Sequence, residues 1–510
     1  MVWDAELLHY PDRLNCAAAL LDDQVAAGRG ARPCLIGADG VVLSYSEVLD
    51  RVNRLASLLT VTYSLVPGNR VLLRGPNSPW IAICWLAVQK AGLVAVATMP
   101  MLRAGELITV IERARVDLAL CDDRFLDELS ATALADMPVI AFGPGTELEV
   151  AMMSASPSFA TCDTAADDPA LIAFTSGTTG QPKGCVHFHR DVLAIADTFS
   201  AHLIQPNEHD VFIGSPPLAF TFGLGGLLVF PLRVGASTVL LEAAAPALLA
   251  DAIARHRATV VLTAPTAYRA MLDRQGPLDL ASLRVAVSAG EPLPLSTRQR
   301  FHEATGLRLV DGLGATEMLH VFISSKGDDI RDGAIGRAVP GFTVAVTDDD
   351  GVEVAAGVVG RLAVRGPTGC RYLDDSRQAT YVQHGWNYPG DTVVCDEDGY
   401  IWYQARADDM IISAGYNIAG PEVEAALLSH DAVAECACVG VPDSERGMVV
   451  KAFVVLRSGV EPSSELVGEL QTHVKSTIAP YKYPRSIEFR PELPKTATGK
   501  LQRFKLRETA

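Results

Sequence analysis

The chain has 510 residues, more than a single hydrophobic core usually organises, so we expect at least two domains. Hydrophobic residues make up 49% of the sequence and charged residues 20%, a balance that excludes an intrinsically disordered chain. The formal net charge of −17 argues against nucleic acid as a partner, because binding a phosphate backbone needs a basic surface, whereas an anionic small molecule needs only a local group of donors.

The N-terminus and the most apolar stretches predict no membrane segment. The first residues, MVWDAELLHYPDR, carry acids early and have no apolar run, so we expect no signal peptide. Residues 80–102 and 216–232 are apolar but are interrupted by a lysine, prolines or glycines, which favours buried elements of a large core. The ten cysteines form no CxxC pair and are expected to be free thiols. We therefore expect a cytoplasmic protein without a membrane partner, as a monomer or a homodimer.

Between about residues 70 and 317, short apolar runs alternate with longer amphipathic segments. The runs at 71–73, 171–174, 259–262 and 284–287 predict strands. The segments 79–91 and 190–202 predict helices between them. This alternation is typical of an α/β fold with doubly wound, mostly parallel sheets, in which ligands bind at the carboxyl ends of the strands.

The pattern changes near Gly341. Strands predicted at 343–346 and 361–364, with a DDDG turn after the first of them, indicate hairpins and a small antiparallel, β-barrel-like subdomain over 341–403. After a charged break at 406–409 comes a compact α+β pattern. Its helices are predicted at 421–429 and 463–478, and its strands at 432–439, 449–456 and 486–489. We expect a large domain at 1–407, whose residues 1–340 form the α/β sheets, and a small domain at 408–510.

The strongest local motif is TSGTTGQPKG at residues 175–184, directly after the predicted strand 171–174. Its glycines let successive backbone N–H groups point inward, while the hydroxyls and one ammonium group add donors. The common P-loop is excluded because no GK[ST] is present. The motif predicts a polyphosphate site, and the alternative is a flexible surface loop.

The same string is similar to the phosphate loop of the adenylate-forming superfamily, which includes acyl-CoA synthetases, nonribosomal peptide adenylation domains and luciferases. Three further motifs match this superfamily in the same order: DGLGATE at 311–317, GD at 390–391 followed by Arg406 and Asp408, and PKTATGK at 494–500. The resemblance covers almost the whole chain. It implies an enzyme that uses ATP and Mg²⁺ to activate a carboxylic acid as an acyl-adenylate, and then passes the acyl group to a thiol, most simply that of coenzyme A.

The resemblance also implies roles for the matched residues. The β- and γ-phosphates of ATP would be held by Thr175, Ser176, Gly177, Thr178, Thr179 and Lys183. The rest of the nucleotide would lie against Gly290, Glu291, Pro292, Asp311, Gly312, Leu313, Asp391 and Arg406. The catalytic residues would be Thr316 at the α-phosphate, Glu317 on Mg²⁺ and Lys500, which would bridge the substrate carboxylate and the α-phosphate. Leu313 departs from the family, because many relatives carry an aromatic residue there.

A mobile small domain is a further implication of the resemblance. Asp408 matches the hinge about which this domain swings between an adenylating and a thioester-forming pose; a solvated linker acid is the alternative. In the second pose Gly415 and Tyr416 would replace Lys500 beside the acyl group, and Gly415 would leave room for the pantetheine arm of coenzyme A.

The acid is predicted to be aromatic. The segment with Ala219 and Phe220 lacks the carboxylate that pairs with an amino-acid substrate, and small residues would leave a flat slot. The slot would be lined by Ala219, Phe220, Ala289, Gly290, Gly314 and His320. The run ATEMLHVF at 315–322 is similar to benzoate and 2-aminobenzoate CoA ligases, which implies contact between His320 and a ring substituent; a structural histidine is an equal alternative. We favour 2-aminobenzoate, then benzoate or a hydroxybenzoate.

Three other functions remain as alternatives. The first is a stand-alone aryl adenylation enzyme that loads the pantetheine of a carrier protein. The second is an oxygenase of the luciferase type, and the third is a regulatory protein that only binds nucleotide. His187 and His189 are expected to have structural roles, because no third metal ligand accompanies them.

Overall fold

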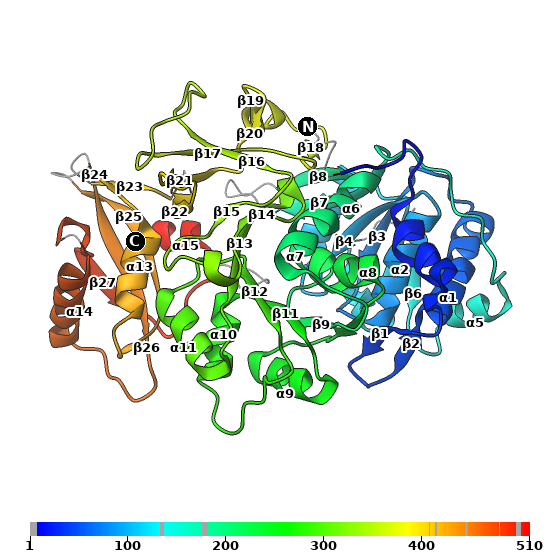
Figure 1. Ribbon diagram of the computed structural model, residues 1–510, viewed down its shortest axis with the longest axis horizontal. Helices are drawn as coiled ribbons and strands as arrows, with labels where there is room; N and C mark the ends of the chain where they lie inside the picture. Colours follow the sequence, from blue (N-terminus) through cyan, green and yellow to red (C-terminus); the bar gives the residue numbers. More distant parts are fainter. Residues whose placement is uncertain are drawn as a thin grey trace.

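The computed structural model describes residues 8–132, 137–175, 182–406, 409–413, 416–443, 447–478, 480–495 and 501–509. Four sheets organise these residues (Figure 1). Two large sheets with their helices form the N-terminal part of the molecule, a six-stranded sheet follows, and a smaller domain ends the chain. The predicted α/β fold with a large N-terminal and a small C-terminal domain is confirmed.

The first large sheet has seven strands in the order β18-β8-β7-β4-β3-β5-β6. The five strands from β7 to β6 are parallel. At one edge, β8 pairs antiparallel with β7, and β18 pairs antiparallel with β8. Val71, Leu72 and Leu73 in the middle of β3 are apolar without alternation, because both faces of the sheet are covered. The strands are β3 (Arg70–Arg74), β4 (Val94–Thr98), β5 (Leu118–Asp122), β6 (Val139–Phe142), β7 (Pro169–Thr175), β8 (Lys183–Phe188) and β18 (Arg371–Tyr372).

The second large sheet has nine strands in the order β15-β14-β13-β12-β11-β9-β10-β1-β2. Its six central strands are parallel, and antiparallel strands close both edges. The strands are β1 (Pro33–Gly37), β2 (Val42–Ser44), β9 (Val211–Gly214), β10 (Ser237–Leu240), β11 (Val260–Thr263), β12 (Val285–Ala289), β13 (Val310–Gly314), β14 (Val321–Ser324) and β15 (Arg337–Ala338).

Helices cover both large sheets. The predicted helix at 79–91 is confirmed as α2, which begins at an N-cap, Ser78, followed by Pro79 at its first position. The α-helices of this part are α1 (Tyr45–Ser57), α2 (Pro79–Lys90), α3 (Ala104–Ala114), α4 (Leu126–Ser130), α5 (Glu147–Ser154), α6 (His189–Ile195), α7 (Thr221–Leu224), α8 (Phe230–Val234), α9 (Pro246–His256), α10 (Pro265–Leu272), α11 (Leu295–Thr305) and α12 (Gln378–Tyr381). Wider π-helical turns occur at Ala18–Asp22, Val25–Arg29, Leu58–Thr62, Ala196–Ile204 and Gly225–Val229.

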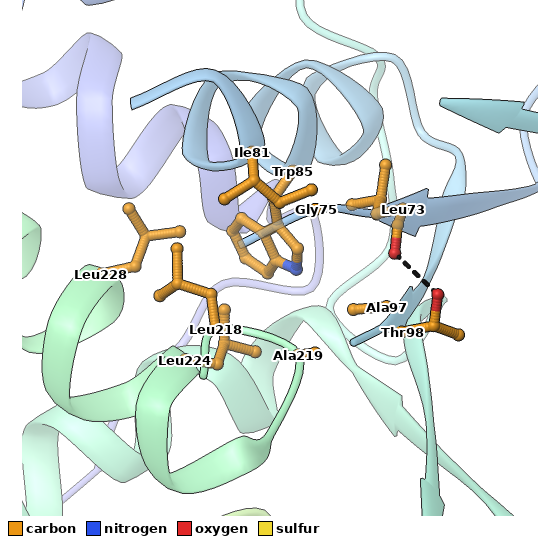
Figure 2. Close-up of a pocket in the computed structure, with 10 residues that line it drawn as sticks. All are labelled: Leu73, Gly75, Ile81, Trp85, Ala97, Thr98, Leu218, Ala219, Leu224 and Leu228. Carbon is orange, nitrogen blue, oxygen red and sulfur yellow. Dashed lines mark hydrogen bonds between the residues drawn. The ribbon is translucent and has the colours of Figure 1, made fainter. Parts of the chain in front are cut away.

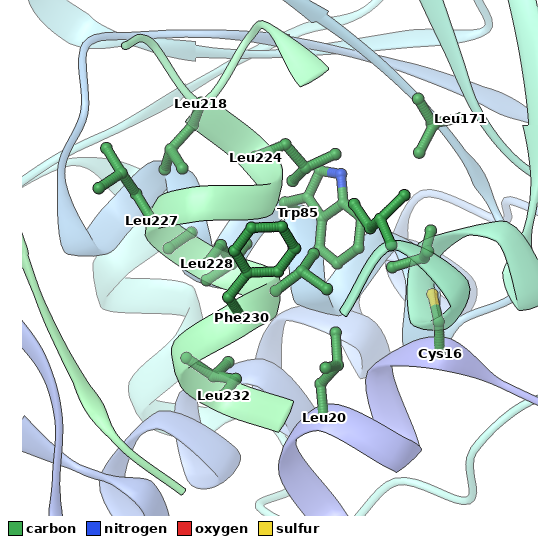
Figure 3. Packing of buried hydrophobic residues seen from close by; sticks show 14 of the residues in the cluster. Cys16, Leu20, Trp85, Leu171, Leu218, Leu224, Leu227, Leu228, Phe230 and Leu232 are labelled. Carbon is green, nitrogen blue, oxygen red and sulfur yellow. The ribbon is translucent and has the colours of Figure 1, made fainter. Parts of the chain in front are cut away.

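The main core lies where α2 meets the helical segment that follows residue 218. Trp85 of α2, Phe230 of α8 and Leu20 of the N-terminal segment converge there with several leucines (Figure 3). Because α2 is buried on nearly every side, its sequence is apolar all round instead of amphipathic.

All ten cysteines are free, as expected. Among the helices of the described residues, none has the length and hydrophobicity needed to cross a membrane.

The predicted hairpin near Gly341 is confirmed, since β16 and β17 pair antiparallel from Thr343–Arg365 to Thr347–Arg361. They belong to a six-stranded sheet in which β19-β20-β17-β21-β22 follow one another and β16 pairs with β17. Its strands are β16 (Thr343–Thr347), β17 (Val359–Arg365), β19 (Val382–Gln383), β20 (Trp386–Asn387), β21 (Asp391–Cys395) and β22 (Ile401–Arg406). One strand of this stretch, β18, leaves the small sheet and pairs with β8 of the first large sheet.

The C-terminal domain has the α+β composition predicted for it. A five-stranded sheet runs β24-β23-β26-β25, with β27 parallel to β26. Its strands are β23 (Ile411–Ser413), β24 (Tyr416–Ile418), β25 (Val433–Asp443), β26 (Gly447–Leu456) and β27 (Ser486–Phe489), and its helices are α13 (Gly420–Leu428), α14 (Ser464–Thr477) and α15 (Arg503–Glu508). The domain has its own core, built around Val423, Val450 and Leu470.

This domain, orange to red in Figure 1, contacts the rest of the molecule through several of its described residues. Helix α13 lies next to β22 of the six-stranded sheet. Arg457, after β26, lies 3.9 Å from a carboxylate oxygen of Asp273, after α10.

Candidate active site

The phosphate motif lies between two paired strands. Thr175 ends β7 and Lys183 begins β8, and these two residues are directly opposite each other in the antiparallel pair. The hydroxyl of Thr175 is buried and has no hydrogen-bond partner among the described residues, so it is available to a ligand. Four predicted phosphate ligands, Ser176, Gly177, Thr178 and Thr179, lie outside the described residues.

Opposite this hairpin stands the turn that carries Thr316 and Glu317. The turn is a single 3₁₀ turn, Thr316–Met318, between β13 and β14. The ammonium group of Lys183 lies 3.3 Å from Oε1 of Glu317, so the fold brings these two predicted residues together over 134 positions of sequence. Leu319 follows with φ +67°, a strained value for a branched residue, as is common beside functional sites.

Three backbone carbonyl groups of this turn accept hydrogen bonds from other segments. Imidazole Nε2 of His187 lies 2.7 Å from the carbonyl oxygen of Thr316. The carbonyl of Glu317 accepts from the amide of Cys370 at 2.8 Å and from the hydroxyl of Tyr381 at 3.3 Å. The hydroxyl of Thr368 donates to the carbonyl of Met318 at 2.8 Å. Hydrogen bonds on all three carbonyls hold the turn in one conformation.

Tyr372 is the residue of this site that sequence reasoning missed. Its hydroxyl donates to Oε1 of Glu317 at 2.7 Å and accepts from the ammonium of Lys183 at 2.9 Å, and that ammonium lies 4.7 Å from the centre of its ring. Burial, together with the negative charge of Glu317, raises the pKa of Tyr372 well above its ordinary value, so the hydroxyl remains a donor. Only an alignment could have indicated this residue, which is 55 positions from Glu317.

His187 and His189 are both fully buried, in agreement with the structural roles predicted for them. Besides its bond to Thr316, His187 places Nδ1 3.5 Å from a carboxylate oxygen of Asp191. His189 accepts from the amide of Cys16 at 3.2 Å, and burial lowers its pKa to about 4.

The residues predicted at the nucleotide base follow two neighbouring strands. Gly290, Glu291 and Pro292 come directly after β12, and Asp311, Gly312 and Leu313 lie in β13, where Gly312 pairs with Ala289. Gly290 has φ +90°, which glycine adopts without strain. Burial raises the pKa of Asp311 to about 7 despite the guanidinium of Arg298 at 3.7 Å. Burial also raises the pKa of Glu291.

Asp391 is the first residue of β21 and is buried. It lies opposite Arg406 in the register of β21 and β22. The backbone therefore brings these two predicted ribose and phosphate ligands side by side.

The residues predicted for the aromatic slot fall into separate groups. Ala219 lines two small adjoining hollows between α2, β4 and β7, one of them shown in Figure 2, and Phe220 lines the other. Their walls are made by apolar side chains, among them Trp85, Ala97, Leu218 and Leu224. Ala289, Gly290, Gly314 and His320 line neither hollow.

Gly314 was expected to keep the slot open, and the structure gives a different reason for it. A Cβ atom at this position would come within 2.7 Å of the carbonyl oxygen of His320, the residue just before β14. The close strand therefore requires glycine here, as it does at Gly312, where a Cβ atom would lie 2.8 Å from Val321.

His320 is buried among three phenylalanine rings. Its ring centre lies 5.3 Å from that of Phe199, 5.5 Å from Phe222 and 4.7 Å from Phe230. Neither ring nitrogen makes a hydrogen bond of normal geometry within the described part of the chain, although the backbone of Phe222 lies close enough to favour the protonated ring slightly. Burial lowers the pKa of His320 to about 3, so the imidazole is neutral at physiological pH.

Three predicted residues of the small domain lie outside the described residues: Lys500, Asp408 and Gly415. The side chains of Tyr416 and of Arg406, the last residue of β22, lie outside them too. The segment with Lys500 is bracketed by an antiparallel bridge between Lys495 and Leu501. The positive charge of Lys495 reaches Glu291, where it opposes the raised pKa of that carboxyl. Lys495, where this segment begins, therefore lies near the residues predicted to contact adenine.

The fit of Mg²⁺ to this site depends on one protein carboxylate. Within the described ranges no group of three or more His, Cys, Asp or Glu side chains could hold a metal ion. Magnesium commonly takes one or two carboxylates and completes its shell with water and phosphate oxygens. Glu317 suits such a site, because both Lys183 and Tyr372 contact Oε1 and leave Oε2 to face a cation.

Comparison with known proteins places the chain in a family. The model of the AMP-binding enzyme family matches residues 22–371, and the model of the AMP-binding enzyme C-terminal domain matches residues 422–500. The chain belongs to the AMP-binding enzyme family. It is thus an adenylate-forming enzyme, as its four motifs indicated.

Its relatives include ligases for aromatic acids. The benzoate–CoA ligase of Thauera aromatica is 36% identical over 512 residues, covering 98% of this chain and 96% of that protein. The 4-hydroxybenzoate–CoA/benzoate–CoA ligase of Rhodopseudomonas palustris is 34% identical, over a region that covers 97% of this chain and 94% of that protein. The crystal structure of the anthranilate CoA ligase AuaEII in complex with anthranoyl-AMP superposes with a TM-score of 0.93 at 32% identity, covering 98% of each chain.

Proposed function

We propose that this AMP-binding enzyme is an aryl-CoA ligase that favours 2-aminobenzoate. The carboxylate of the acid attacks the α-phosphate of ATP, which forms the aryl-adenylate and releases pyrophosphate. The thiol of coenzyme A then attacks the acyl carbon, which forms the thioester and releases AMP. The observation that carries the proposal is the meeting of Lys183 and Glu317 beside the phosphate hairpin, in a chain related along its whole length to benzoate and anthranilate CoA ligases.

The first step is a problem of charge. A carboxylate must approach a polyphosphate of the same sign, so fixed cations and donors are needed around the α-phosphate. Thr175, Lys183 and the segment 176–179 hold the β- and γ-phosphates in this proposal. Mg²⁺, held by Glu317, supplies charge neutralisation there.

The remaining nucleotide contacts follow the strand ends already described. The adenine lies against Gly290–Pro292 and Asp311–Leu313, and Thr316 contacts the α-phosphate. Asp391 accepts from both ribose hydroxyls, which suits a carboxylate with two acceptor oxygens, and Arg406 supports it.

For the acid, we propose a slot formed by Ala219, Phe220, Ala289 and Gly290, with His320 behind it. A neutral, buried imidazole suits a polar ring substituent, because it accepts or donates a hydrogen bond without bringing a charge into an apolar site. An ortho-amino group provides such a partner, which favours 2-aminobenzoate over benzoate.

We also propose that residues 408–510 form a lid hinged at Asp408 on a body of residues 1–407. In one pose Lys500 bridges the carboxylate and the α-phosphate. In the other, Gly415 and Tyr416 replace it and line the path of the pantetheine arm. The nearness of Lys495 to Glu291 supports the first pose, because it brings the base of the Lys500 segment to the nucleotide side.

The test is ATP–pyrophosphate exchange with a panel of aromatic and aliphatic acids, followed by AMP release with a thiol acceptor. We expect exchange to be fastest with 2-aminobenzoate, and AMP release to require free coenzyme A. AMP release only with a pantetheinylated carrier protein would instead identify an aryl adenylation enzyme. No exchange with any aryl acid would refute the proposal.

A further inference from the structure

We infer that Tyr372 is a positioning residue of the nucleotide site, which orients the carboxylate of Glu317 toward the metal ion that accompanies ATP. The inference rests on the proposed function, because it assumes that Glu317 and Lys183 meet Mg²⁺ and the phosphates. It adds a residue that belongs to none of the four motifs.

The first step is the geometry of the three side chains. Lys183 donates to the hydroxyl of Tyr372 at 2.9 Å, and Tyr372 donates to Oε1 of Glu317 at 2.7 Å. The direct contact from Lys183 to Glu317 is longer, at 3.3 Å. The shortest link in the cluster is therefore the one between the phenol and the carboxylate, a hydrogen bond to a charged acceptor of the stronger kind.

The second step is what happens when the nucleotide arrives. The phosphates attract Lys183 and the metal attracts Glu317, so the ion pair between these two side chains must be exchanged for contacts to the ligand. Tyr372 has no charge to exchange, because a phenol is neutral at physiological pH. Its bond to Oε1 can persist and leaves Oε2 as the oxygen presented to the cation.

The third step is that Tyr372 is itself fixed in place. Its strand, β18, pairs with β8, and its amide donates to the side-chain carbonyl of Gln378 at 2.7 Å. Arg113 of α3 donates to the carbonyl of Pro182 at 2.8 Å and to Asp375 at 3.1 Å, which ties the phosphate hairpin to the segment that follows Tyr372. A rigid donor of this kind can orient a carboxylate, whereas a mobile one could not.

Tyr381 provides a matched control. Its ring centre lies 5.2 Å from that of Tyr372, and both side chains are buried. Its hydroxyl also bonds to Glu317, but to the backbone carbonyl and at 3.3 Å. Tyr372→Phe and Tyr381→Phe thus each remove one buried hydroxyl from the same pair of rings, and only the first removes a bond to the carboxylate.

The experiment measures Mn²⁺ binding to the full-length protein with a non-hydrolysable ATP analogue, by electron paramagnetic resonance and without any acid. We expect Tyr372→Phe to weaken Mn²⁺ binding about tenfold, as for loss of a hydrogen bond to a charged group. Tyr381→Phe should stay within about twofold of the wild type, because the shorter bond from the amide of Cys370, at 2.8 Å, still holds the same carbonyl of Glu317. In pyrophosphate exchange, the Mg²⁺ concentration for half-maximal rate should rise by a similar factor in Tyr372→Phe.

Thermal unfolding of each variant, recorded first, sets an assay temperature at which all are folded. Wild-type Mn²⁺ affinity in Tyr372→Phe would overturn the inference, as would an equal loss in Tyr381→Phe, which would point to packing alone. These outcomes are separate from the proposed function. A wild-type protein that binds the metal–nucleotide complex but activates no aryl acid would refute the proposed function only, and one that binds no metal with nucleotide would refute both.

Discussion

At the scale of single residues, the site combines an ion pair at the phosphate hairpin with buried groups whose pKa is shifted by desolvation. Lys183 and Glu317 form the ion pair, whereas His320 and Asp311 are of the second kind. Burial governs the pKa of both residues of the second kind, in opposite directions because their charged forms differ in sign.

Asp311 should make stability depend on pH. Its folded-state pKa, about 7, is above the ordinary value of 3.8, so the stability it contributes is complete below pH 3.8 and is lost as the pH rises through 7. Asp311→Asn stays neutral and avoids this loss. The free energy of unfolding of the variant relative to the wild type should therefore increase by about 2–3 kcal/mol between pH 5 and pH 8 in urea denaturation. Asp349→Asn, at a side chain that is 99% exposed, is the control and should show no such trend.

His320 should decide between acids that differ at the ortho position. In His320→Leu the imidazole is lost, and the ratio of kcat/KM for 2-aminobenzoate to that for benzoate should fall about tenfold, as when a polar partner of a substrate is removed. Pyrophosphate exchange with both acids measures the ratio. His302→Leu, at an exposed site on α11, should leave it unchanged. An unchanged ratio in His320→Leu would leave the histidine with a structural role only.

At the scale of elements, sequence reasoning succeeded where structure is set locally. The helix predicted at 79–91 and the apolar runs of β7, β11 and β12 correspond to elements that the structure contains within a few residues. It failed where a contact is made over long range. The two-residue strand β18 has no periodicity of its own and exists because β8 offers it an edge, so neither the strand nor Tyr372 could be predicted.

In the helix-rich segment after residue 218, the detailed helix geometry could not be predicted, because it depends on close packing. The π-helical turn Gly225–Val229 depends on close packing, since a Cβ atom at Gly225 would lie 2.4 Å from Cδ2 of His320. Such a glycine looks like any other in the sequence. For the candidate site, the motifs predicted which strand ends carry the nucleotide residues. They could not predict that Ala219 lines a hollow from which Ala289 and His320 are absent, because this depends on how the helices and sheets pack together.

Gly225→Ala tests this packing. The added methyl group must displace the imidazole of His320, and we expect the free energy of unfolding to fall by about 1–3 kcal/mol, the usual cost of overpacking a core. Gly105→Ala in α3 is the control, because a Cβ atom there meets nothing within 4 Å. Its better helix propensity should raise the free energy of unfolding by about 0.5–1 kcal/mol. Equal effects of both changes in urea denaturation would contradict the packing assigned to Gly225.

At the scale of the whole molecule, the proposed reaction needs the small domain to bring one lysine to the large one. Lys500→Ala should slow acid-dependent pyrophosphate exchange about 100- to 1000-fold, by analogy with the loss of one charge-stabilising donor. ATP binding should change little, because Lys183 and Glu317 remain. Lys505→Ala, on the exposed side of α15, removes the same charge from the same domain and should retain exchange. Near-normal exchange in Lys500→Ala would remove this residue from the reaction.

The path of β18 has a consequence for building chimeras from such ligases. Residues 341–403 resemble a self-contained module in the sequence, yet the chain inside this stretch crosses over, adds an edge to the first large sheet and delivers Tyr372 to the phosphate hairpin before it returns. A graft cut at 341 and 403 would exchange part of the nucleotide site along with the module. Junctions that retain residues 368–381 of the recipient would transplant the small sheet and leave that site native.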